Sequence, residues 1–215
     1  TYSHAFALAK AAEMINAGKE SQVYDTIIAK CKKLEQTHAV VLCIGGDFHS
    51  EDLVLEYTLN AHAAADLGAP ALLLLKGANR NAGDLIESAR NSIRELRGNA
   101  VEVLGCVLNW SQLSAADANN FVAGVTGAPE AQRAANVFVM PENAEASGAP
   151  DKAIAYFEKN LDGKALVKAI DDYAVTVVTP KMFEFALMER ASKHKMRIVL
   201  PEGTDDRIVT AGAEV

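Results

Sequence analysis

The sequence contains few cysteines, and their scarcity excludes a protein held together by disulfides or by zinc. Its three cysteines are Cys31, Cys43 and Cys106, which are too far apart in the sequence for a C-x-x-C pair, a zinc motif or a disulfide framework. We expect all three to be buried as small hydrophobic residues of a protein in a reducing, cytoplasmic compartment.

Positive charge and long apolar runs are scarce as well. The 21 Lys and Arg residues are outnumbered by 28 Asp and Glu residues, which gives a net charge of −7. Such a chain does not attract nucleic acid or anionic lipid electrostatically. The longest apolar run, Ala69 to Leu75, is far shorter than the roughly 20 residues that span a bilayer. We therefore expect neither nucleic acid nor a membrane as a partner, and the 50% apolar content suffices for a globular core.

The motifs of several enzyme classes are also missing. The chain has no G-x-x-x-x-G-K-[ST] phosphate loop, no G-x-G-x-x-G after a strand and no G-x-S-x-G nucleophile elbow. None of its five histidines lies in an H-E-x-x-H motif. We predict no metal site, no tightly bound cofactor and no catalytic residue of these kinds.

What the sequence does contain is an alternation of strand and helix patterns over residues 1–110. Continuous apolar runs predict buried strands at 39–44, 70–75 and 101–108. Helical patterns surround them at 3–18, 21–36, 50–68 and 84–96. This order predicts an α/β fold, a parallel sheet flanked by helices. Because ligands of such sheets bind beyond the carboxyl ends of the strands, we expect any site in the loops that follow the strands.

The second half of the chain carries weaker patterns. Residues 111–150 are rich in Ala, Asn, Gly and Pro and are predicted to be a linker or irregular, although 136–140 could form a strand. Residues 151–215 follow, with helical patterns at 151–160, 164–172 and 179–191. A strand at 196–200 and a last helix capped by Thr204 or Asp205 complete the predicted start of a second α/β domain.

Two groups of residues are candidates for a site. Gly45 and Gly46, at the end of the first predicted strand, form either an anion-binding loop or an ordinary turn, and Asn109 either pairs with a base edge or closes a turn. Near the carboxyl end, Glu202, Gly203 and Arg207 lie between a predicted strand and a helix. They form either a cleft wall that holds an anion or a helix cap with a local ion pair.

Two segments carry a resemblance to a known family. One segment resembles the opening of the catalytic domain of phosphate acetyltransferases. It comprises residues 178–191, which begin Val178-Thr179-Pro180-Lys181, and residues 197–208, which contain Leu200-Pro201-Glu202-Gly203-Thr204-Asp205-Asp206-Arg207. Residues 1–110 resemble the rear part of the dethiobiotin-synthetase-like domain that precedes the catalytic domain in long forms, through Val40 to Gly46 and Gly105 to Asn109. The resemblance implies a P-loop-like fold without its P-loop. This sequence departs from the family's pattern at two positions. Gly45 stands where the family usually has an acidic residue, and Trp110 stands where it often has a basic one.

The resemblance also implies a function. The family interconverts acetyl-CoA and phosphate with acetyl phosphate and coenzyme A by attack of the coenzyme A thiolate, so small-molecule substrates and a homo-oligomer are expected of the full-length form. Because the chain opens and closes inside helical patterns and has no room at 111–150 for the family's middle domain, we expect a fragment that is inactive alone. Two alternatives stay open: a non-catalytic regulatory or oligomerisation module, and a relative of the phosphate butyryltransferase type.

Overall fold

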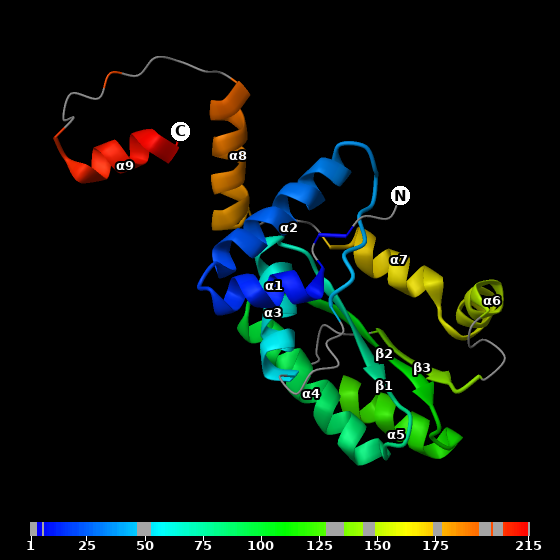
Figure 1. Cartoon of the computed structure of the whole chain (residues 1–215). Helices are drawn as coiled ribbons and strands as arrows, with labels where there is room; N and C mark the ends of the chain where they lie inside the picture. The colour runs from blue at the N-terminus through cyan, green and yellow to red at the C-terminus, as the bar shows by residue number, and fades with distance from the viewer. Residues whose placement is uncertain are drawn as a thin grey trace. The chain divides into compact units, whose positions relative to one another are not determined.

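The computed structural model describes residues 4–5, 7–46, 53–127, 136–143, 149–173, 178–193, 199 and 204–214 (Figure 1). The chain forms two compact units. One comprises Tyr57–Val177, and the other joins Thr1–Glu56 to Val178–Val215. The expected division into 1–110, 111–150 and 151–215 concerns homologous domains and stays a prediction.

The unit Tyr57–Val177 is built on a three-stranded parallel sheet in the order β1-β2-β3. Its strands are β1 (Ala71–Lys76), β2 (Val103–Ser111) and β3 (Asn136–Pro141). The helices of the unit are α3 (Leu53–Asp66, from Tyr57 onward), α4 (Ala82–Gly98), α5 (Ala115–Thr126), α6 (Pro150–Asn160) and α7 (Gly163–Asp171). The sequence prediction of a parallel α/β fold is confirmed.

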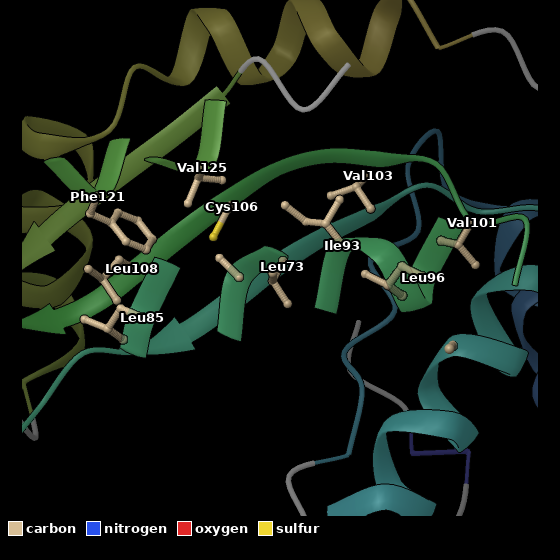
Figure 2. Close-up of a cluster of buried hydrophobic side chains, with 12 residues drawn as sticks. Leu73, Leu85, Ile93, Leu96, Val101, Val103, Cys106, Leu108, Phe121 and Val125 are labelled. Atoms are coloured by element: carbon tan, nitrogen blue, oxygen red, sulfur yellow. The ribbon is translucent and has the colours of Figure 1, made fainter. Parts of the chain in front are cut away.

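Side chains from β2 alternate between the two faces of the sheet. Cys106 and Leu108 point to the face covered by α4 and α5, where they join the main core (Figure 2). Phe121 from α5 and Leu85 from α4 are fully buried there. Val107 points to the other face, where it packs with Met140 from β3 and with Leu161, which follows α6. The sheet is therefore dry on both sides at its central strand, as the continuous apolar pattern of β2 predicts.

Local sequence signals begin the helices of this unit. The Asn81 side chain accepts a hydrogen bond from Asp84 N at 2.9 Å at the start of α4, and Ser114 Oγ accepts one from Asp117 N at 3.1 Å at the start of α5. In each case a short polar side chain satisfies an amide that the first helical turn leaves without a partner.

Two strands pack closely because one residue lacks a side chain. Gly105 of β2 lies opposite Asn136 of β3, and a Cβ placed on Gly105 would stand only 2.5 Å from the Asn136 carbonyl oxygen. Glycine is thus required at this position for the backbones to approach as they do.

The other unit contains α1 (Leu8–Asn16), α2 (Glu20–Glu35), α8 (Pro180–Lys193) and α9 (Asp206–Glu214). Helix α2 buries Val23 and Ile28, and Lys181 of α8 donates to Asp25 of α2 at 2.8 Å. Thr179 Oγ1 caps α8 by accepting a hydrogen bond from Met182 N at 3.1 Å. The predicted helices at 21–36 and 179–191 are confirmed.

The structure corrects the first predicted strand. Residues 39–44 form neither helix nor strand, and Val40, Leu42 and Ile44 are 77%, 82% and 78% exposed. Among the described residues of its unit no strand lies beside this segment, so its backbone has no ladder to join. The third strand of the sheet is β3 instead. It lies in 111–150, where we expected a linker, and α5 lies there too.

Candidate functional site

The carboxyl ends of the three strands are joined by a chain of hydrogen bonds. The Asn79 amide, in the loop after β1, donates to Gln112 Oε1 at 3.0 Å, and Gln112 Nε2 donates to Glu142 Oε2 at 2.8 Å. Hydrogen bonds from Gln112 and from the Trp110 side chain hold the pKa of the Glu142 carboxyl below its usual range. The network fixes the relative positions of three loops at the edge where ligands of parallel sheets bind.

Trp110 has an unusual backbone conformation at this edge. Its φ is 57°, in the left-handed region, and the β2–β3 register shifts between Leu108 and Ser111. A left-handed bulky residue costs about 1–3 kcal/mol, a strain more common at functional sites than elsewhere. The Asn109 side chain supports the conformation by accepting a hydrogen bond from Trp110 N at 2.9 Å.

The loop after β1 approaches β2 closely. A Cβ on Gly77 would lie 3.1 Å from the Ser111 Cα and 3.3 Å from the Asn109 carbonyl oxygen. The Gly77 amide instead donates to that Asn109 oxygen at 2.8 Å. A glycine here lets the loop after β1 meet the end of β2, next to the residues of the hydrogen-bond network.

Beside this network lies an open pocket of about 330 Å³. Side chains from β1, β2, β3 and α6, together with the turn after β3, line it: Leu74, Val107, Asn109, Trp110, Met140, Pro141, Asn143, Ala153, Tyr156 and Phe157. The Tyr156 hydroxyl donates to the Pro141 carbonyl at 2.8 Å, which fixes α6 against the end of β3. We call these ten residues the strand-end pocket.

The lining of the strand-end pocket determines what it can bind. It combines three aromatic rings, Trp110, Tyr156 and Phe157, with the amides of Asn109 and Asn143, and none of its residues carries a charge. Such a surface suits the flat face of an uncharged ring and offers no cation to a phosphate group.

The site residues predicted from the sequence do not all lie at the strand-end pocket. Asn109 does line the pocket. Gly45 and Gly46 are exposed and lie in the coil that replaces the expected strand, so the loop expected after a strand at 39–44 does not follow one. Glu202 and Gly203 lie outside the described residues.

Arg207 forms a local ion pair at the start of α9. Its Nη2 lies 2.7 Å from Asp205 Oδ2, and its backbone amide donates to Asp205 Oδ1 at 2.9 Å. The Arg207 side chain is 90% exposed. Asp205 and Arg207 thus form a helix cap with a local ion pair, and the anion-holding role of Glu202, Gly203 and Arg207 stays a prediction.

Sequence reasoning missed Gln112, Glu142, Tyr156 and Phe157. The last three follow or face β3, which lies in the segment that we expected to be irregular. The one signal that could have found them is the strand-like pattern of 136–140, because the residues after a parallel strand line the binding edge.

Metal and membrane features are absent from the described part of the chain. Within it, no three His, Cys, Asp or Glu residues are grouped so that they could hold a metal ion. None of its helices has the length and apolar character needed to cross a membrane.

Comparison with known proteins identifies one relative that aligns with nearly the whole chain and another that aligns with about half of it. The sequence is 22% identical to phosphate acetyltransferase of Nitratidesulfovibrio vulgaris (strain Hildenborough) over 338 aligned positions, which cover 97% of this chain and 48% of the relative. This chain is related to phosphate acetyltransferase. The phosphate acetyltransferase of Synechocystis sp. (strain PCC 6803) is 28% identical over 114 residues, which cover 52% of the chain and 16% of that relative. No family model and no solved structure matches.

The chain spans about half the length of the Nitratidesulfovibrio phosphate acetyltransferase. Because 338 aligned positions exceed the 215 residues of the chain, roughly 120 positions or more of the alignment have no counterpart in it, which is the size of a domain. This is consistent with a fragment of the long form of the enzyme.

Proposed function

We propose that the chain is part of a phosphate acetyltransferase, which interconverts acetyl-CoA and phosphate with acetyl phosphate and coenzyme A in acetate metabolism. The observation that carries the proposal is the similarity to one such enzyme over 97% of the chain. Coenzyme A is then a substrate of the full-length enzyme rather than a bound cofactor, and the protein acts in the cytoplasm as a homo-oligomer.

We further propose that the 215 residues alone do not catalyse this transfer. A transferase site must hold phosphate and the thioester together in a water-poor cleft. In the segment that resembles the catalytic domain, Arg207 is exposed and paired with Asp205, and Phe183 and Leu187 of α8 are 58% and 48% exposed. These side chains form a surface rather than the wall of a cleft.

One experiment tests both statements. The gene that encodes the chain is tagged at its chromosomal locus, and the purified product is assayed for acetyl phosphate and free coenzyme A formed from acetyl-CoA and phosphate. The chain of 215 residues, expressed by itself, is assayed in parallel, with the Nitratidesulfovibrio enzyme as the positive control. We expect phosphate-dependent turnover from the native product and none from the isolated chain.

The two outcomes are separable. A native product without turnover, beside an active control, refutes the assignment to phosphate acetyltransferase. Robust turnover by the isolated chain refutes only the proposal that it lacks the active site.

The strand-end pocket favours a second function within the same protein. We propose that it binds a small molecule with an uncharged planar ring and so makes the unit Tyr57–Val177 a regulatory module. The carrying observation is the combination of three aromatic rings with two amides and no charge. Nucleobases and nicotinamide have this chemistry.

Trp110 provides the readout, because it is the single tryptophan of the chain. Adenosine and nicotinamide are titrated while the Trp110 fluorescence is recorded, with calorimetry as a second measurement. We expect saturable quenching by at least one of them and its loss in Phe157→Ala. Phe183→Ala, which removes an exposed ring of α8, should leave it unchanged. Absence of saturable binding of both compounds refutes the ring-binding function.

A further inference from the structure

The two cysteines of one unit lie close together, although the sequence places them far apart. Cys31 of α2 and Cys43 of the coil 39–46 have their Sγ atoms 4.0 Å from each other, and both are free thiols. Cys31 is buried, whereas Cys43 is exposed, which corrects the expectation that all three cysteines are buried. A pair with one accessible sulfur and a second sulfur close behind it suits thiol–disulfide exchange, in which the first attacks and the second resolves the mixed disulfide.

The two sulfur atoms need to move only a short way to form a disulfide bond. A disulfide has its sulfur atoms about 2.05 Å apart, so the two atoms must approach by about 2 Å. Cys31 is held in a helix, but the segment of Cys43 belongs to neither a helix nor a strand. We therefore expect rotation of the Cys43 side chain and a shift of its coil to bring the two sulfurs together.

The environment gives the two sulfurs different reactivity. The hydrogen bond between the thiols lowers the pKa of Cys43 to about 7 and raises the pKa of Cys31, which burial and the Glu35 carboxylate raise further. Glu35 Oε1 lies 3.6 Å from Cys31 Sγ, and Lys32 pairs with the same carboxylate at 2.8 Å. Because Cys43 is exposed and Cys31 is buried, a disulfide in solution reaches the Cys43 sulfur first, and the lowered pKa of Cys43 agrees with this order. The buried sulfur has the Glu35 carboxylate within reach for its proton.

We propose that Cys31 and Cys43 are a redox-active pair that closes reversibly into a disulfide and fastens the coil 39–46 to α2. The oxidant is a small-molecule disulfide of the glutathione class. The Cys43 thiolate attacks one sulfur of that disulfide, which forms a mixed disulfide and releases one thiolate. The Cys31 sulfur then attacks Cys43 Sγ and displaces the second thiolate. The protein pair loses two electrons and two protons, and two glutathione thiols receive them.

Alternative uses of the pair have less support. A metal site needs further ligands, and within the described residues no third His, Cys, Asp or Glu completes one. The third cysteine, Cys106, takes no part in the proposal because it lies in the sheet core, where burial raises its pKa to about 12. It serves as an internal control.

The test uses the chain of 215 residues and glutathione disulfide. After oxidation the protein is denatured, alkylated with iodoacetamide and weighed intact, and a second portion is digested with trypsin without reduction. We expect the number of alkylated thiols to fall from three to one and the alkylation of Cys43 to fall about tenfold or more, both reversed by dithiothreitol. Lys32 and Lys33 lie between the two cysteines, so trypsin separates them unless a disulfide joins them.

Two variants distinguish an internal disulfide from simple modification of an exposed thiol. Cys31→Ser removes the resolving sulfur, so a stable mixed disulfide with glutathione should accumulate on Cys43. Cys106→Ser should form the same disulfide, with the thiol count falling from two to none. A stable mixed disulfide on Cys43 of the unmodified chain, a dimer linked through Cys43 or an unchanged thiol count overturns the proposal. The peptide map of the unmodified chain decides even if a variant fails to fold.

Discussion

Substitution of Gly105 by alanine tests the closest approach in the sheet. The new Cβ would lie 2.5 Å from the Asn136 carbonyl oxygen and 3.0 Å from the Asn136 Cβ, both in β3. Because the obstructing atoms belong to backbone or stand next to it, no side-chain rotation relieves the contact and the strands must separate. We expect a destabilisation of about 1–3 kcal/mol, typical of overpacking.

Urea denaturation and thermal unfolding followed by circular dichroism measure this effect. For a chain of this size each kcal/mol shifts the melting temperature by about 2–4 °C. The matched control is Gly98→Ala at the end of α4, where nothing lies within 4 Å of the new Cβ. Alanine there reduces the entropy of the unfolded chain, so stability should stay the same or rise by up to about 1 kcal/mol. Equal midpoints for the two variants would refute the described packing of β2 against β3.

Two further predictions address the core and the strand-end network. Phe121→Ala removes a fully buried ring and should lower the free energy of unfolding, measured in urea, by about 3–5 kcal/mol. The same change at the exposed Phe183 should lower it by less than about 1 kcal/mol. Similar losses in the two variants would contradict the assigned core. Glu142 has a lowered pKa, so its stabilising effect is present above its unfolded-state pKa and is lost as the pH falls through the folded value. Gln112→Ala removes the largest cause and should move the acid midpoint of the Trp110 fluorescence upward, and an unmoved midpoint would show that Gln112 does not hold this carboxylate.

The sequence predicts the central strand of the sheet correctly. It does not predict whether an apolar segment has a neighbouring strand to pair with. The run Val103–Leu108 within the predicted strand 101–108 indicates β2, because a strand buried on both faces is apolar along its length. The run at 39–44 is also apolar, yet it is an exposed coil, because an apolar composition does not specify a neighbouring strand. Strand β3 has an equally short apolar pattern and is paired because β2 lies beside it.

The sequence indicates which edge of the sheet to search, but not which side chains gather there. The rule that ligands bind beyond the carboxyl ends of parallel strands points to the loop after β2, and Asn109 lines the pocket beside that loop, while its binding role stays a prediction. The left-handed Trp110 could not be predicted, because the bulge that produces it arises from the pairing of β2 with β3. The pair of Cys31 and Cys43 depends in the same way on a coil that folds back on α2, which no spacing rule covers.

The edge strand β1 has a consequence for handling the protein. Leu72 and Leu74 of this strand are 41% and 64% exposed, and β1 pairs with β2 on one side only among the described strands. An apolar edge strand is a template on which a second chain can add its own strand, and runs rich in leucine without charge favour such aggregation. Preparations of the 215-residue chain should therefore lose monomer as concentration rises. A lysine at the most exposed position, Leu74→Lys, is the substitution expected to suppress that loss.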